Sequence, residues 1–131
     1  MSTPLTGTVV GVGTDLVEVE RFRLAMTRRG SRFSERLFSD DERRYAQRHR
    51  DPAPRLAARF AAKEAVMKAL GVGLWKFAFR DVEVVRAPSG APSIALRGKA
   101  ADLATARGVG SWQLSLSHTN ETAIAVALAL A

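Results

Sequence analysis

Charged side chains interrupt an apolar stretch near the middle of the chain, RFAAKEAVMKALG at residues 59–71. If this stretch is a helix, Glu64 and Lys68 share one face, because residues four apart are neighbours on a helix. Arg59 and Lys63 repeat the same spacing. One interpretation is a set of solvated surface contacts, with the basic stems lying over apolar surface. The other is that a core helix holds these charges at its edge because a reaction needs them there.

The segment GVGTD at residues 11–15 offers a second carboxylate. In an extended strand its two glycines and Asp15 point to the same side, which leaves room for a bulky ligand to approach the backbone. Mg²⁺ is held by a few carboxylates and by phosphate oxygens, so Asp15 and Glu64 would supply two ligands if the strand packs against the helix. The plainer interpretation is a strand-ending aspartate with glycines that serve a turn. Leu16 stands where a GxGxxG motif needs its third glycine, so a Rossmann site is unsupported.

A histidine between hydroxyl groups forms the third group, in LSLSHT at residues 114–119. His118 follows a predicted strand at a turn, and Ser117, His118 and Thr119 could together bind phosphate oxygens. A Ser–His hydrolase is disfavoured, because Gly-x-Ser-x-Gly is absent and neighbouring residues on a strand point apart. A histidine at a turn is also common as a structural or solvent-exposed residue.

The elements that must position these groups alternate between helical and extended patterns. We predict helices that begin near Ser34, at the capping box of Ser39 to Glu42, and at Pro54, the last ending at Gly71 or Gly73. The predicted order is β-α-α-α-β-β-α-β-β, an α+β domain with a mainly antiparallel sheet packed against helices, formed by residues 1–131 as a single domain. The other ranges are strands at 8–12, 81–86, 93–96, 111–117 and 122–130, and helices at 19–29 and 99–107.

The composition is that of an ordinary globular protein, with 47% hydrophobic and 25% charged residues. The absence of cysteine excludes disulfides and thiolate metal sites. The first residues carry no signal-peptide pattern, and the apolar end at residues 123–131 is shorter than the ~20 residues of a membrane span. We therefore predict a soluble cytoplasmic protein that does not enter a membrane.

Positive charge is concentrated near the N-terminus. Twenty Lys and Arg residues against thirteen Asp and Glu residues give a net charge of +7 and a pI near 11.0. Such a field attracts anions, whether nucleic acid, phosphorylated metabolites, an acidic membrane or an acidic protein. Between residues 21 and 36 Glu35 is the only acid, beside six arginines at positions 21, 23, 28, 29, 32 and 36.

Taken together, the three segments closely resemble the holo-(acyl carrier protein) synthase family, the short-chain 4′-phosphopantetheinyl transferases. GVGTDLVEVERF matches the N-terminal motif of that family, RFAAKEAVMKALGVG its central helix and LSLSHTNETAIAV its C-terminal hairpin, and the likeness covers essentially the whole chain. The combination of GxD with FAAKEAxxKA is specific. Val66-Met67 replaces a common Phe-Ser pair and Val72 a frequent threonine, but neither departure removes a charged ligand.

The resemblance implies a phosphopantetheinyl transferase-like fold and a defined reaction. A 4′-phosphopantetheine group passes from coenzyme A to a serine of apo acyl carrier protein, with adenosine 3′,5′-bisphosphate as the other product, in support of fatty acid biosynthesis. By the same resemblance Asp15 and Glu64 bind Mg²⁺, and Lys68 contacts the pyrophosphate as the third catalytic residue. Arg59 and His118 match positions that contact coenzyme A phosphates. The other positions implied to bind this co-substrate are Lys63, Gly71, Gly73 and Thr119.

The resemblance also gives the arginine-rich segment a partner. Acyl carrier proteins are strongly acidic, and the family docks them on the helix after the GxD motif. The docking positions correspond to Arg21, Met26, Arg29 and Arg32, basic groups around an apolar anchor. Family members form homotrimers with each active site at a subunit interface. That assembly would cover a last strand, residues 123–130, whose two faces are both apolar.

Two other classes of function compete with this interpretation. A small basic RNA- or DNA-binding domain would explain the pI, but it gives Asp15 and Glu64 no role, and it needs exposed aromatic rings on a sheet. The rings near predicted strands, Phe77, Phe79 and Trp112, form no clear platform, so we do not expect nucleic acid as a partner. A scaffold that binds the carrier without catalysis is disfavoured by the intact set of Asp15, Glu64 and Lys68.

Overall fold

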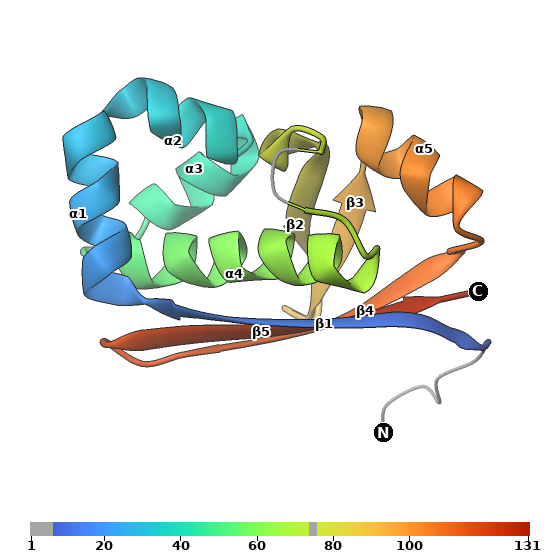
Figure 1. The fold of residues 1–131 in the computed structure, drawn as a ribbon. Helices are drawn as coiled ribbons and strands as arrows, with labels where there is room; N and C mark the ends of the chain where they lie inside the picture. Colours follow the sequence, from blue (N-terminus) through green and yellow to red (C-terminus); the bar gives the residue numbers. More distant parts are fainter. Residues whose placement is uncertain (1–6, 74–75) are drawn as a thin grey trace.

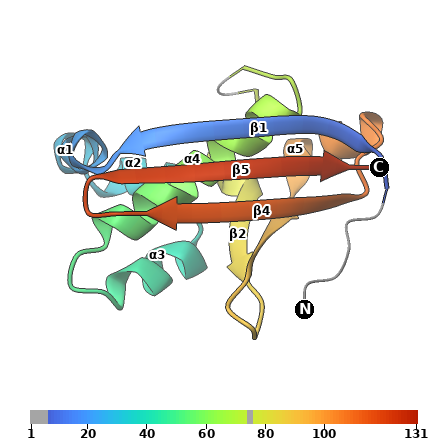
Figure 2. The same ribbon diagram turned by 90° about the horizontal axis from the view of Figure 1, so that it is seen from below.

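Three long strands form the floor on which the rest of the molecule lies. The structure is a computed structural model that describes residues 7–73 and 76–131 of the chain. Strands β1 (Val9–Glu18), β5 (Thr122–Leu130) and β4 (Ser111–His118) form an antiparallel sheet in the order β1-β5-β4. Figure 2 shows this sheet from below, with β5 in the middle. The helices all lie on its other side (Figure 1). The chain thus has the predicted α+β architecture.

Helix α4 (Ala53–Ala69) crosses the inner face of this sheet, and small residues let it lie close. The inward side chains of β5 are alanines with no exposed surface, and most inward residues of α4 are alanines as well. At β1 the approach is closer still, because a Cβ on Gly11 or Gly13 would overlap the carbonyl oxygen of Ala69 or Ala65. The prediction that these two glycines leave space for a ligand is wrong, since the backbone of α4 occupies that space.

Three further helices cover one end of α4 (Figure 1): α1 (Val19–Arg29), α2 (Ser31–Leu37) and α3 (Asp40–Gln47). Gly30 separates the first two with a φ of 76°, a conformation that glycine adopts without strain. The predicted capping box begins α3, because the Ser39 hydroxyl accepts from the Glu42 N–H and Glu42 accepts from the Ser39 N–H. The predicted order is short by one helix, because α2 stands as a separate element between Gly30 and Ser39.

A second, smaller sheet completes the fold beside α4. Strands β2 (Val82–Arg86) and β3 (Pro92–Leu96) form an antiparallel hairpin after a 3-10 turn at Phe79–Asp81, η1. Helix α5 (Gly98–Ala106) then leads back to β4. No helix in the described ranges is long and apolar enough to cross a membrane.

The outer face of the large sheet carries exposed apolar side chains. Val12 and Leu16 of β1 are 58% and 64% exposed, and Ile124 and Val126 of β5 are 40% and 38% exposed. These residues are cross-strand neighbours, because Leu16 pairs with Ile124 in the ladder. Nothing in the described part of this chain covers them. This strip, the β1–β5 face, is therefore a surface that a partner would bury.

Candidate active site

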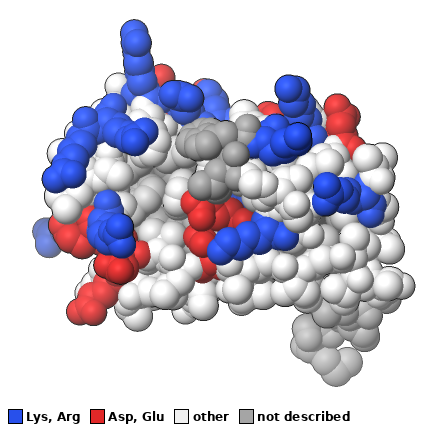
Figure 3. Space-filling view, in the orientation of Figure 1, with Lys and Arg blue, Asp and Glu red and all other residues white. Residues whose placement is uncertain are grey.

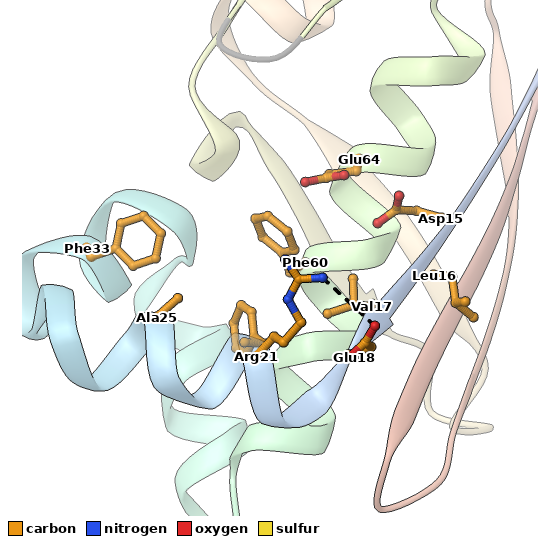
Figure 4. Close-up of a pocket in the computed structure, with 10 residues that line it drawn as sticks. Asp15, Leu16, Val17, Glu18, Arg21, Ala25, Phe33, Phe60 and Glu64 are labelled. Carbon is orange, nitrogen blue, oxygen red and sulfur yellow. Dashed lines mark ion pairs between the residues drawn. The ribbon is translucent and has the colours of Figure 1, made fainter.

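Two carboxylates and one ammonium group meet where β1 passes α4. Asp15 points inward from β1 like the two glycines before it, and its side chain is only 11% exposed. The Lys68 ammonium lies 3.1 Å from Asp15 Oδ1 and donates to the Thr14 carbonyl oxygen at 2.9 Å. Glu64, one turn before Lys68 on α4, lies near Asp15 and close enough for the two carboxyl groups to interact (Figure 4). The structure thus brings together the three residues that sequence analysis assigned to catalysis.

The environment of Glu64 changes its acidity. Its carboxyl is half-buried, and burial together with the neighbouring charge of Asp15 raises the pKa of Glu64 to about 7. Lys68 opposes this shift without cancelling it. When Glu64 is ionised, the two carboxylates repel each other, and a cation between them would relieve that repulsion.

The donor set suits a hard cation that keeps other ligands. Within residues 7–73 and 76–131 no group of three or more His, Asp or Glu side chains is arranged to hold a metal ion. Asp15 and Glu64 would supply two carboxylate ligands, which matches the habit of Mg²⁺ of using one or two carboxylates with water and substrate phosphate oxygens. The residues present therefore fit Mg²⁺ better than a metal that requires a complete protein cage.

A cavity of about 410 Å³ opens from these carboxylates toward α1 and α2. Figure 4 shows Asp15 and Glu64 on one side of it and Ala25 and Phe33 on the other, with Phe60 between them. Arg21 lies at its edge, and its guanidinium is 3.9 Å from Glu18. We call this space the carboxylate pocket. Its walls combine one acidic end with aromatic and aliphatic surface, so it can accept a chain that ends in a charged group.

The predicted docking residues lie on the helices that border this pocket. Arg21, Arg29 and Arg32 are exposed, while Met26 is partly buried and packs against the core. The Arg29 guanidinium lies 4.9 Å from the centroid of the Phe33 ring, a favourable cation–π distance. The surface around the carboxylate pocket is therefore cationic with an aromatic component.

Arg59 and His118 meet in a different cavity, of about 370 Å³, which we call the arginine pocket. Arg59 is 4% exposed, its guanidinium carbon lies 4.2 Å from the centroid of the Tyr45 ring, and burial lowers its pKa. Its Nε atom is buried and has no hydrogen-bond partner within the described chain. Arg55 and Arg86 also line the cavity. Three arginines and a histidine around one hollow make a site for an anion.

The two pockets have no lining residue in common. Helix α4 contributes residues to both pockets. Glu64 follows Arg59 by five positions and therefore projects from a different side of the helix. A ligand that needs both groups of residues therefore has to span two sides of α4, or the second group has to come from another copy of the chain.

The remaining predicted contacts with co-substrate are scattered. Lys63 has no exposed surface: its ammonium donates to Glu42 at 2.8 Å and to the carbonyl oxygens of Phe79 and Val82. Thr119 caps the β4–β5 turn, where its hydroxyl accepts from the N–H groups of residues 121 and 122. Gly71 and Gly73 are exposed just beyond the end of α4. Lys63 is thus placed as a core residue, whereas the other three are open to solvent.

Sequence analysis did not identify three other residues that line the arginine pocket. Tyr45, Arg55 and Arg86 come from α3, α4 and β2 and are far apart along the chain. No spacing in a single sequence links them. The one available signal was the density of arginine around Tyr45, which is a common context for cation–π contacts.

The sequence and the fold match known proteins over almost the whole chain. A family model described as the 4′-phosphopantetheinyl transferase superfamily matches residues 11–127. The holo-[acyl-carrier-protein] synthase of Desulforudis audaxviator is 46% identical over 122 residues, 93% of each chain. That of Caldanaerobacter subterraneus subsp. tengcongensis is 40% identical over 119 residues, 91% of this chain and 93% of its own.

Solved structures of holo-[acyl-carrier-protein] synthases also match the chain over most of its length. The holo-[acyl-carrier-protein] synthase of Neisseria meningitidis is 29% identical with a TM-score of 0.85, covering 95% of this chain and all of its own. The Helicobacter pylori enzyme in complex with coenzyme A is 33% identical with a TM-score of 0.79, covering 90% of this chain and 98% of its own. The chain belongs to the 4′-phosphopantetheinyl transferase superfamily. Within it the chain is an enzyme of the holo-[acyl-carrier-protein] synthase group.

Proposed function

We propose that this enzyme transfers 4′-phosphopantetheine from coenzyme A to a serine of apo acyl carrier protein in a Mg²⁺-dependent reaction. Holo acyl carrier protein and adenosine 3′,5′-bisphosphate are the products, and the reaction supports fatty acid biosynthesis in the cytoplasm. The observation that carries the proposal is the meeting of Asp15, Glu64 and Lys68 at one point of the β1–α4 junction. The names of the relatives, and the coenzyme A bound to the Helicobacter pylori enzyme, support the substrate pair.

The residues at the junction divide the work of phosphoryl transfer. Asp15 and Glu64 would hold Mg²⁺, which when bound neutralises charge on the pyrophosphate. The Lys68 ammonium is already oriented by the Thr14 carbonyl oxygen and by Asp15, and its side chain is 54% exposed. It can therefore turn toward an incoming phosphate and stabilise the leaving group. The carboxylate pocket would receive the serine of the carrier and the pantetheine arm.

The arginine pocket suits the other end of coenzyme A. An anion held by Arg59 and His118 would satisfy the buried Nε atom that lacks a partner. We assign this pocket to the 3′-phosphate, one of the coenzyme A phosphates that the family resemblance links to these two residues. Because the two pockets have no lining residue in common, one coenzyme A molecule would use the carboxylate pocket of one subunit and the arginine pocket of its neighbour. The exposed β1–β5 face supports assembly into a homotrimer.

The positive charge around the carboxylate pocket indicates the surface that would bind the carrier protein. The exposed arginines at positions 21, 29 and 32 border the carboxylate pocket, and an acyl carrier protein is acidic. Opposite charges steer two proteins together and fix their orientation. The carrier serine would then be delivered to Asp15 and Glu64 from the side of α1.

The test is incubation with coenzyme A, Mg²⁺ and an apo acyl carrier protein, read by intact mass. We expect the carrier to gain one phosphopantetheine group with the wild-type enzyme, and no detectable gain with Asp15→Asn or Glu64→Gln or after chelation of Mg²⁺. Glu20→Gln, which changes an exposed glutamate of α1, is the matched control and should transfer normally. An unmodified carrier in every wild-type reaction would exclude the transferase. Normal transfer by Glu64→Gln would exclude its role as a metal ligand.

A further inference from the structure

A second cationic hollow lies on the far side of α2 from the carboxylate pocket. Two cavities, of about 800 and 490 Å³, share the lining residues Lys76, Phe77 and Lys99 and therefore form one continuous depression. We call it the Lys76 groove. It runs between the end of α2, the η1 turn and the start of α5. Figure 3 shows Lys and Arg side chains along the upper edge of the molecule, over α2 and again to the right of it.

The groove combines an apolar floor with an excess of positive over negative side chains. Phe77 and Phe79 are 4% and 1% exposed and lie beneath a rim formed by Arg36, Lys76, Arg80 and Lys99. Two of these cations, Lys76 and Lys99, form no ion pair with any residue in the described ranges.

Acidic side chains also lie in or beside the groove. The Asp81 carboxylate lies against Gly98, the first residue of α5, where the positive end of the helix dipole favours a negative charge. Asp40 is 3.5 Å from Arg80 but also pairs with Arg43. Asp81 and Asp102 also line the groove, so four cations face two carboxylates and the lining keeps a net positive charge.

Helix α2 is a wall that both hollows use. Phe33 lines the carboxylate pocket, and Arg36, three residues further on, lines the Lys76 groove. Arg36 also follows Arg32 by one helical turn, so the two guanidinium groups extend one row of charge along α2. The cationic surface around the carboxylate pocket thus continues over α2 into the groove.

We infer that the Lys76 groove is a second docking site for the acidic carrier protein, which contacts the enzyme on both sides of α2. This inference rests on the proposed function. Its cations are spread along a groove with an aromatic floor, whereas a phosphate ligand would need them to converge on one point. Spread cations over apolar surface match a protein surface that carries acidic side chains beside exposed aliphatic ones.

The test is direct binding of an apo acyl carrier protein to the full-length enzyme, without coenzyme A, for wild type and for Lys76→Glu/Lys99→Glu. We expect the double variant to bind the carrier about tenfold more weakly and to lose part of the salt dependence of binding. Lys76→Arg/Lys99→Arg keeps the charge and should bind like wild type. Arg44→Glu/Arg50→Glu makes the same change in charge on an exposed surface elsewhere and should have at most a small effect.

The possible outcomes distinguish the role of the groove from the proposed transferase activity. Equal binding by wild type and Lys76→Glu/Lys99→Glu, with normal transfer by both, overturns the groove and leaves the transferase intact. Equal weakening by the Arg44→Glu/Arg50→Glu control reduces the effect to net charge and also overturns it. A raised KM for coenzyme A with unchanged carrier binding would instead make the groove a phosphate site. If wild type binds no carrier at all, that result contradicts both the groove as a docking site and the acyl carrier protein as the proposed substrate. Arg21→Glu, on the α1 side, serves as a positive reference for weakened binding.

Discussion

Glu64 has a carboxyl group whose protonation changes near neutral pH, and this affects the stability of the metal-free protein. Its folded-state pKa of about 7 exceeds its ordinary value of 4.5. Between these values the folded protein binds more protons than the unfolded chain does, so the free energy of unfolding falls as the pH rises. The contribution of Glu64 is complete below the lower pKa and is lost as the pH passes the higher one.

We therefore expect Glu64→Gln, in the presence of a chelator, to be more stable than wild type at pH 8 but not at pH 4. Since the side chain is half-buried and solvent screens it, the gain should be about 1 kcal/mol, less than the full shift implies. Urea denaturation at the two pH values measures it. Added Mg²⁺ should stabilise wild type at pH 8 and not the variant. A constant difference between the proteins at both pH values would show that Glu64 is not the titrating group.

Lys63 shows where family resemblance and physical environment differ at a single residue. The resemblance groups it with contacts to coenzyme A, yet its ammonium is buried and paired with Glu42, which in turn accepts from the Val84 N–H. A buried ion pair of this kind is satisfied only if every partner stays in place. A single sequence could not reveal this, because Lys63 and Glu42 are 21 positions apart. Its contact with coenzyme A stays a prediction.

At the scale of elements, the packing of α4 against β1 depends on two residues without side chains. A Cβ at Gly13 would overlap the Ala65 carbonyl oxygen and could be accommodated only by moving the helix. We expect Gly13→Ala to lower the free energy of unfolding by about 3 kcal/mol or more, because backbone atoms cannot yield as flexible side chains do. Thermal or urea denaturation measures the loss.

The neighbouring position supplies the control. Val12 lies on the outer face and is 58% exposed, so Val12→Ala should change the stability of the monomeric unit by about 0.5 kcal/mol or less. A Gly13→Ala protein as stable as wild type would mean that α4 and β1 do not approach as closely as described. Failure of Gly13→Ala to fold under conditions in which Val12→Ala folds would be the extreme of the expected loss.

Helices and hairpins were predictable because their signals are local. The predicted bounds of α1 and β5 agree with the structure, and the capping box at Ser39 begins α3 as expected. Strand β1 is longer than predicted, since Thr14 to Glu18 continue the ladder with β5. The polar residues of this segment do not indicate a strand. Its pairing depends on a partner strand more than 100 positions away, which a local sequence pattern does not reveal. The meeting of Asp15 with Glu64 was first predicted only on the condition that the strand packs against the helix, and the family motif then supported it.

For the whole molecule, the main consequence is assembly. The β1–β5 face exposes Leu16 and Val126 across a sheet whose other side is the core. We expect a homotrimer in solution and predict that Leu16→Glu converts it to monomer, because a charge would be buried without a partner. Analytical ultracentrifugation measures the mass. Leu24→Glu, at an exposed leucine of α1, is the matched control and should leave the oligomer unchanged. A wild-type monomer at micromolar concentration would contradict the assembly.

Shared active sites make a stricter prediction. If the carboxylate pocket of one subunit works with the arginine pocket of the next, Asp15→Asn and His118→Ala chains should each be impaired but complement each other when refolded together. Random mixing leaves about one site in four with both pockets intact, so about a quarter of wild-type activity should return. Recovery no greater than the average of the separate variants would place both pockets in the same subunit's site.

The glycines of β1 also bear on how much this sequence can change. Because peptide groups set the distance between β1 and α4, the spacing of Asp15 and Glu64 does not depend on the volumes of nearby apolar side chains. Val66 and Met67 are buried core residues of the same helix. Saturation mutagenesis should therefore tolerate several residues at those two core positions, while positions 11 and 13 accept glycine alone. Substitutions among the apolar side chains of the core should therefore leave the spacing of the reacting groups unchanged.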